Sequence, residues 1–315
     1  MKTGTQHLYI PGPTNVPEVV RQAMNVPMQD HRAPDYGNLT MGLFRDLKTI
    51  FKTETGRVMM FPGSGTACWE AAILNTLNPG DKVLMARHGQ FSHLWVEMAK
   101  KLGLDVECVE LAWGAGVPVN EFARILGNDR QGKIKAVFVT HNETATGVTS
   151  DVALVRRALD EAFHDALLFV DGVSSIACID FRMDEWGVDL AVTGTQKGFM
   201  LPAGLAILGV SDRALAAMEG AKLPRTFFDF ADHLRSVRAG GYPYTPAVGL
   251  IAGLARSVEM LEDEGMEAVF ARHHRLAEGV RRAVAAWGMR PCAASSDLCS
   301  DTVTAVVVPQ AANGT

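Results

Sequence analysis

Short apolar runs alternate with amphipathic stretches through the first two thirds of the chain, and this alternation restricts the folds that are possible. Seven runs have the length and apolar content of buried strands: 57–61, 82–86, 106–111, 134–140, 166–170, 190–193 and 205–210. Stretches of helical periodicity lie between several of them, at 66–77, 91–102, 121–126 and 152–163. Continuous apolar strands separated by helices are typical of a mostly parallel sheet covered on both faces. We therefore predict an α/β fold on a seven-stranded sheet.

The composition is that of an ordinary globular protein. The 315 residues are 48% hydrophobic and 21% charged, and the net charge is −5 with no basic block. This balance argues against nucleic acid or an anionic membrane as the main partner. No apolar run approaches the roughly 20 residues of a membrane span, and the first residues lack the apolar stretch of a secretory signal. We expect a cytoplasmic protein that binds neither nucleic acid nor membrane.

The five cysteines do not predict a disulfide framework or a metal site. Their number is odd, and no two of them have C-x-x-C spacing. Most lie in apolar surroundings, where a free cysteine usually acts as a small buried hydrophobic residue. We expect no metal.

The pattern changes at Pro246. Two long helical stretches follow, at about 248–264 and 267–287, and then an apolar run at 302–308. We predict an N-terminal arm (1–20), a large domain (21–245) and the beginning of a smaller α/β domain (246–315). A strand at a chain end without further strands makes a thin domain, so we expect this smaller domain to be incomplete.

Ligands of α/β sheets bind beyond the carboxyl ends of the strands, so the residues that come after each run are candidate site residues. The first run is followed by Pro-Gly-Ser-Gly-Thr at 62–66, which opens a helix. Small residues at a helix N-terminus let backbone N–H groups approach a phosphate. An ordinary strand-to-helix turn has the same composition, so this segment alone leaves both interpretations open.

Two charged residues follow other apolar runs. Asp171 comes after 166–170, and a carboxylate there needs a partner because unpaired burial is costly. Lys197 comes after 190–193, between Gln196 and Gly198. The alternative interpretation of the aspartate is a helix cap or a salt bridge, and that of the lysine is a solvated loop residue. The segment 141–147 after a further run is rich in hydrogen-bonding side chains, as functional loops often are.

Together, the glycine-rich turn at 62–66, Asp171 and Lys197 match the needs of one cofactor, pyridoxal 5′-phosphate. Its aldehyde requires a lysine, its pyridine nitrogen a carboxylate, and its phosphate a helix N-terminus. A nicotinamide-dependent dehydrogenase also fits the alternating pattern and the glycine-rich turn, but it leaves Lys197 and Asp171 without a role.

The chain resembles the class V aminotransferases of fold type I, in particular the serine–glyoxylate, aspartate–glyoxylate and alanine–glyoxylate group. The matching segments occur in the family's order along nearly the whole chain: IPGPTNVP at 10–17, DHR at 30–32, GSGT at 63–66, HNETATG at 141–147, VDGVSS at 170–175, GTQKG at 194–198 and GYPYTP at 241–246. The resemblance implies transfer of an amino group from L-serine or L-aspartate to glyoxylate, giving glycine and a 2-oxo acid by a ping-pong mechanism.

The family's site residues carry over position by position. Lys197 would form the Schiff base with pyridoxal phosphate and move the substrate proton, and Asp171 would pair with the pyridine nitrogen. The positions implied to bind the rest of the cofactor are Ser64, Gly65, Thr66 and Gln196 at the phosphate, Phe91 on the ring and Thr144 at the phenolic oxygen. Tyr242 and Thr245 match positions that reach the cofactor of a neighbouring subunit, which implies a homodimer.

One position of the family pattern is missing. The arginine that binds the substrate carboxylate in the family falls beyond residue 315, and Arg32 is more simply explained as a structural or interface residue. The amino donor (serine, aspartate or alanine) therefore stays open.

A cysteine desulfurase shares the fold but needs a reactive cysteine on a mobile loop, and a homodimer that binds the cofactor without turnover is the non-enzymatic alternative.

Overall fold

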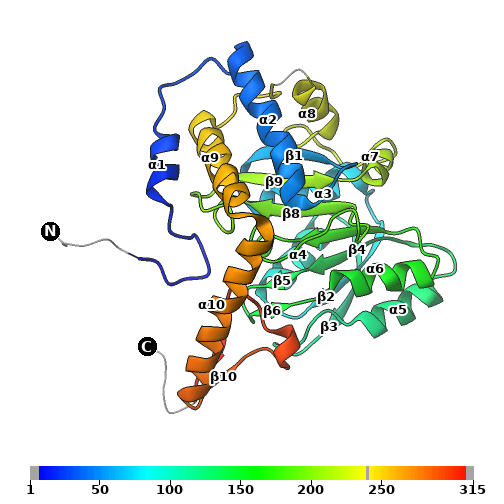
Figure 1. Ribbon diagram of the computed structural model, residues 1–315. Helices are drawn as coiled ribbons and strands as arrows, with labels where there is room; N and C mark the ends of the chain where they lie inside the picture. Colours follow the sequence, from blue (N-terminus) through cyan, green and yellow to red (C-terminus); the bar gives the residue numbers. More distant parts are fainter. Residues whose placement is uncertain (1–6, 239–240, 310–315) are drawn as a thin grey trace.

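The computed structural model describes residues 7–238 and 241–309, and a seven-stranded sheet forms its centre (Figure 1). The strands are, in spatial order, β1 (Arg57–Gly63), β9 (Gly204–Val210), β8 (Leu190–Gly194), β7 (Leu167–Asp171), β4 (Ile134–Thr140), β2 (Lys82–Arg87) and β3 (Asp105–Glu110). Only β9 runs antiparallel to its neighbours. The predicted mostly parallel, seven-stranded sheet is confirmed.

Helices cover both faces of the sheet, because alternate strand residues point to opposite faces and both sets are apolar. In β1, Met60 faces one apolar cluster while Met59 and Phe61 face the other. The first cluster contains residues of α2 (Pro34–Phe51), α5 (Val119–Asn128), α6 (Val152–Glu161) and α9 (Val248–Glu264). The second contains residues of α3 (Gly65–Thr76), α4 (Gln90–Lys101), α7 (Asp212–Met218) and α8 (Phe230–Val237).

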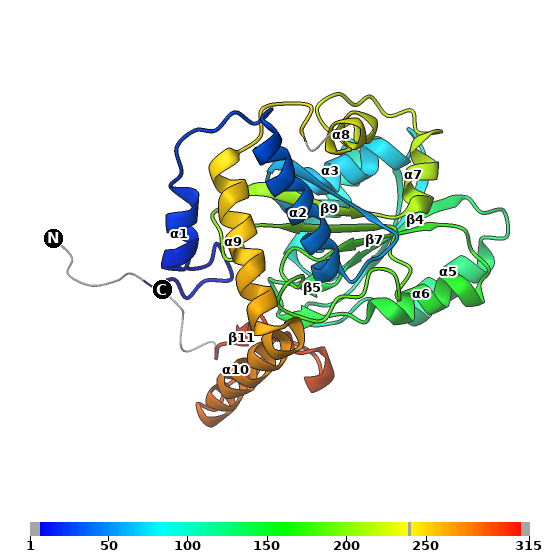
Figure 2. The same ribbon diagram turned by 45° about the horizontal axis from the view of Figure 1, so that its top comes forward.

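The C-terminal part leaves the sheet along α10 (Met266–Ala286), which follows α9 after Gly265 (Figures 1 and 2). Gly265 has a φ of 81°, a backbone conformation that glycine adopts without strain. Beyond α10 lies a two-stranded sheet of β10 (Arg290–Pro291) and β11 (Val306–Val307), with a 3₁₀ turn at Ser296–Leu298 between them. The predicted strand at 302–308 is therefore wrong in extent: only Val306 and Val307 are paired, because β10 offers two partner residues.

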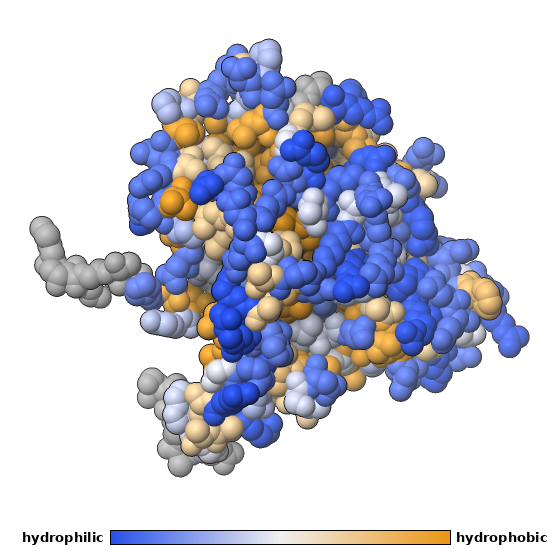
Figure 3. Space-filling view, in the orientation of Figure 1, coloured by the Kyte–Doolittle hydropathy of each residue, from blue (hydrophilic) through white to orange (hydrophobic). Residues whose placement is uncertain are grey.

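The N-terminal part lies against the first face of the sheet. The short helix α1 (Glu18–Met24) packs beside α9, and α2 comes after it along the same side (Figure 1). Val19 of α1 and Leu39 and Met41 of α2 remain exposed, and the surface in this region carries several hydrophobic areas (Figure 3). No helix within residues 7–238 and 241–309 has the length and apolar character that crossing a lipid bilayer requires.

Candidate active site

The carboxyl ends of the parallel strands bring Asp171, Lys197 and the start of α3 to one edge of the sheet. Asp171 ends β7, where it pairs with Thr140 of β4 and Val192 of β8. The prediction that Asp171 comes after the strand is wrong by one residue, because these neighbours extend the ladder to it. A Cβ atom on Gly194, the last residue of β8, would lie 3.0 Å from the backbone nitrogen of Gly65. The segment that carries Lys197 thus lies directly beside the start of α3.

The N-terminus of α3 is open to an anion. Ser64 is the N-cap in an extended conformation, and its side chain makes no capping hydrogen bond. The first turn of this 12-residue helix contains no acidic residue, so the partial positive charge of the backbone N–H groups is not offset there. A Cβ atom on Gly65 would overlap the Val173 side chain, so any larger residue there would force Val173 to move. Beside them, the side-chain oxygen of Gln196 is buried without a hydrogen-bond partner in the described chain.

Asp171 is buried, and no described residue forms an ion pair with it. One oxygen accepts a hydrogen bond from the Val173 backbone N–H at 2.9 Å. Burial raises the pKa of Asp171 to about 7, and the negative charge of Glu143 adds to the rise, whereas the Val173 N–H and Lys197 oppose it. A cation placed against this carboxylate would relieve the cost of its burial.

Lys197 lies under the N-terminal segment. Its Nζ donates a hydrogen bond to the Pro11 carbonyl oxygen at 2.6 Å, and the Thr14 backbone N–H donates to the Gln196 carbonyl at 3.1 Å. Burial lowers the pKa of Lys197, although Asp171 and Cys178 act in the opposite direction. The lysine opens onto a cavity of about 250 Å³ whose wall includes Thr144, Ser174, Cys178, Arg272 and Thr302.

The segment 141–147 forms a hydrogen-bonded network beside this cavity. The Thr144 hydroxyl donates to Ser174 Oγ at 2.9 Å, and the Asn142 amide donates to the same oxygen at 2.8 Å and to Thr302 Oγ1 at 3.0 Å. Ser174 Oγ itself donates to the Asn142 carbonyl at 3.0 Å. Neither Ser174 nor Thr302 was predicted from the sequence as a site residue, although Ser174 lies within the VDGVSS segment.

Proteins with similar sequences identify the family of this chain. The family model described as aminotransferase class-V matches residues 11–313. The chain is 57% identical over 308 residues to an L-aspartate–glyoxylate aminotransferase of Paracoccus denitrificans, covering 98% of this chain and 78% of the relative. It is also 57% identical to a serine–glyoxylate aminotransferase of Hyphomicrobium methylovorum, over 98% of this chain and 76% of the relative. The chain belongs to the class-V aminotransferase family.

Solved structures of aminotransferases share the fold. An aspartate aminotransferase of Thermus thermophilus superimposes with a TM-score of 0.89 at 28% identity, covering 97% of this chain and 83% of that one. An alanine–glyoxylate aminotransferase of Nostoc gives 0.90 at 27% identity, over 98% and 81%. The predicted fold type I is confirmed, and the dehydrogenase alternative is wrong.

Class-V aminotransferases use pyridoxal 5′-phosphate, and the residues of this edge fit that cofactor. The buried, unpaired Asp171 matches a protonated pyridine nitrogen, and the uncapped start of α3 matches a phosphate. Lys197 offers a primary amine, and burial lowers its pKa. Phe91, the second residue of α4, is half-buried near the same edge and offers a ring face.

Tyr242 and Thr245 are not brought to Lys197 within the chain. Both line a separate narrow pocket that includes Met60 and Phe227. The Tyr242 hydroxyl is buried without a partner in the described part of the chain, and burial raises its pKa well above the usual value. Arg32 lies in another open depression, which Tyr242 also borders. The cross-subunit roles of Tyr242 and Thr245 stay predictions.

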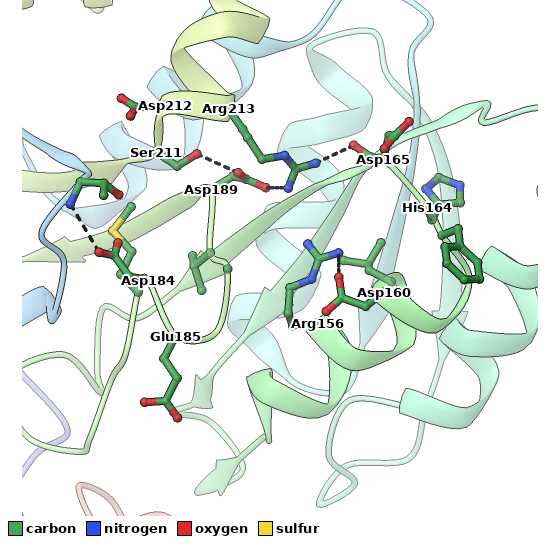
Figure 4. A pocket seen from close by; sticks show the side chains of 16 residues that line it. Arg156, Asp160, His164, Asp165, Asp184, Glu185, Asp189, Ser211, Asp212 and Arg213 are labelled. Carbon is green, nitrogen blue, oxygen red and sulfur yellow. Dashed lines mark hydrogen bonds and ion pairs between the residues drawn. The ribbon is translucent and has the colours of Figure 1, made fainter.

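A wider cavity of about 790 Å³ lies at the amino ends of the strands, on the edge opposite Lys197 (Figure 4). Two ion pairs form among the charged side chains of its wall. Asp189 accepts from Arg213 at 3.0 Å and from the Ser211 hydroxyl at 2.7 Å, and Arg156 pairs with Asp160 at 2.6 Å. This cavity does not lie at the carboxyl edge, where ligands of such sheets bind.

Proposed function

We propose that this aminotransferase moves the amino group of L-aspartate or L-serine to glyoxylate, giving glycine and the corresponding 2-oxo acid. The observation that carries the proposal is the 57% identity with the aspartate–glyoxylate and serine–glyoxylate enzymes over 98% of the chain. The geometry of the sheet edge supports it, because a lysine, a buried carboxylate and an open helix N-terminus lie together there.

Each residue has a chemical role in this proposal. Ser64, Gly65 and Thr66 bind the cofactor phosphate through the start of α3, with Gln196 beside them. Phe91 would offer its ring face to the cofactor, and Thr144 would contact its phenolic oxygen. Asp171 would keep the pyridine nitrogen protonated. When bound, pyridoxal phosphate supplies an electron-withdrawing ring that stabilises the negative charge left at the substrate Cα.

Lys197 moves the proton at the substrate Cα. An amine acts as a base only in its neutral form, and an ordinary lysine is almost fully protonated near pH 7. Burial lowers the pKa of Lys197 and so increases the neutral fraction. The N-terminal segment contacts the amine through the Pro11 carbonyl, which accepts a hydrogen bond from Lys197 Nζ.

We also infer that the active unit is a homodimer. Tyr242 and Thr245 line a pocket apart from the chain's own Lys197, which suits residues that reach a neighbouring site. Exposed apolar residues of the N-terminal part, among them Tyr9, Ile10 and Met41, offer surface for such contact.

The cysteine desulfurase alternative gains no support from Cys178. This residue does line the Lys197 cavity, a position that its apolar sequence surroundings did not indicate. However, it is buried, and burial raises its pKa to about 12, so the thiolate needed for attack on a substrate sulfur is scarce.

The proposal is tested by supplying the purified protein with pyridoxal phosphate and glyoxylate and measuring glycine formed from different donors. We expect L-aspartate or L-serine to be used with a kcat/KM at least about tenfold above that for L-alanine, a difference that one well-placed polar contact can provide. Sulfide release from L-cysteine without glycine formation would instead support a desulfurase. Cofactor binding without turnover of any donor would support the non-enzymatic alternative.

A further inference from the structure

We propose that Glu143 is a positioning residue for the cofactor, whose buried carboxylate joins the loop that carries Thr144 to the start of the helix that carries Phe91. The proposal rests on the proposed function, because it assumes that Thr144 and Phe91 contact pyridoxal phosphate. Glu143 is not among the residues that line the Lys197 cavity, and in this proposal it acts through the two elements that would contact the cofactor.

The hydrogen bonds of the carboxylate define the junction. Glu143 lies in β5 (Asn142–Glu143), which forms a two-stranded ladder with β6 (Val148–Thr149), and it is fully buried. Its Oε2 accepts from the Ser92 backbone N–H at 2.8 Å, and its Oε1 accepts from the Phe91 N–H at 3.2 Å. The same Oε1 also accepts from the Ala145 N–H at 3.2 Å, within its own loop. One side chain thus binds backbone groups of both elements that would contact the cofactor.

This carboxylate takes the place of the N-cap side chain that usually comes from the helix itself. The N-cap of α4 is Gly89, which has no side chain to accept the first N–H groups. A Cβ atom on Gly89 would overlap the Glu143 side chain, so the glycine provides the space for it. A negative charge at a helix N-terminus is favourable, and three N–H donors offset the cost of burying it. The capping group therefore comes from a segment about fifty residues away along the chain.

The sharing of one carboxylate couples the two cofactor contacts. The Phe91 backbone N–H is itself held by Glu143, and Thr144 is the next residue after Glu143. A shift of α4 would move the loop, and a shift of the loop would move α4. The charge also acts at a distance, since it contributes to the raised pKa of Asp171.

The test is the dissociation constant of pyridoxal phosphate for Glu143→Gln in the full chain, together with the visible circular dichroism of the bound cofactor. Glutamine has the same size, but its NH₂ group must face at least one of the backbone N–H groups, which leaves a donor against a donor. We expect about tenfold to a hundredfold weaker binding and a smaller dichroic band. Binding and dichroism equal to those of the wild type would overturn the proposal.

Ser92→Ala is the matched control. The Ser92 hydroxyl accepts from the His88 and Gly89 N–H groups at 3.1 and 3.0 Å, so it stabilises the same turn of α4 without contacting the Thr144 loop. We expect its cofactor affinity to stay within about threefold of the wild type, since only a local cap is lost. An equal effect of Ser92→Ala and Glu143→Gln would show a general loss of helix capping and would overturn the proposal.

A double-mutant cycle with Phe91→Ala separates positioning from stability. If Glu143 acts partly through the Phe91 ring, Glu143→Gln weakens binding much less in the Phe91→Ala background than in the wild type. Fully additive effects would contradict the proposal.

Should Glu143→Gln fail to fold, Glu143→Asp keeps the charge with a shorter reach, and wild-type affinity in that variant would overturn it. Absence of cofactor binding by the wild-type protein would instead overturn the proposed function.

Discussion

Lys197→Ala is expected to lower the rate of glycine formation by about 10⁴-fold or more. The substitution removes both the amine that binds the cofactor aldehyde and the base that moves the proton at the substrate Cα, and each loss alone is large. The remaining rate would come from cofactor binding by Asp171 and the start of α3. The measurement is kcat with the preferred donor at saturating glyoxylate and added cofactor.

The control for this substitution is Lys133→Ala, because Lys133 is an exposed lysine at the opposite edge of the sheet, just before β4. Its activity should equal that of the wild type. The assignment of Lys197 would be wrong if the Lys197→Ala variant kept more than a small fraction of the wild-type rate while Lys133→Ala behaved normally.

Asp171→Asn is expected to lower kcat by about a thousandfold. The amide has the shape of the carboxylate but no charge, so it cannot keep the pyridine nitrogen protonated, and the ring withdraws electrons less strongly. The same substitution should raise the stability of the cofactor-free protein at pH values above the pKa of Asp171. Activity close to that of the wild type would contradict the role of Asp171.

The stability effect depends on pH in a defined direction. The pKa of Asp171 is about 7 in the folded chain and near 3.8 when unfolded, so folding favours the protonated form. The stability that the protonated carboxyl contributes is present below about pH 4 and is lost as the pH rises toward 7. At about pH 8 the cofactor-free Asp171→Asn variant should be more stable than the wild type, by at most about 4 kcal/mol. Urea unfolding of the wild type and of the Asp171→Asn variant at about pH 4 and about pH 8 measures this difference. A wild type that is more stable than the variant at about pH 8 would contradict it.

The main features of the site could be predicted because they lie at strand ends, and strand ends are visible in the sequence. The apolar runs stop at Asp171 and shortly before Lys197, and the parallel arrangement places those ends on one edge. The small residues after β1 were equally visible. These features depend only on local pattern and on the direction of the strands.

The contacts between segments could not be predicted. Glu143 reaches α4 from 51 residues away, and Ser174 meets Thr144 and Asn142 across about 30 residues, so no local pattern announces either contact. The helix α2 was missed despite its periodic apolar residues, because it precedes the first strand and so lies outside the strand–helix alternation on which the prediction was based. The short helices α7 and α8 contain too few turns for a clear period.

The most direct test of the site is the position at which pyridoxal phosphate attaches to the protein. Reduction of the loaded protein with borohydride makes that attachment permanent, and mass spectrometry of the peptides then locates it. We expect the added mass on the peptide that contains Lys197, and its absence after prior reaction with the amino donor. Attachment at another lysine, or no attachment at all, would contradict the assignment of Lys197 and with it the proposed function.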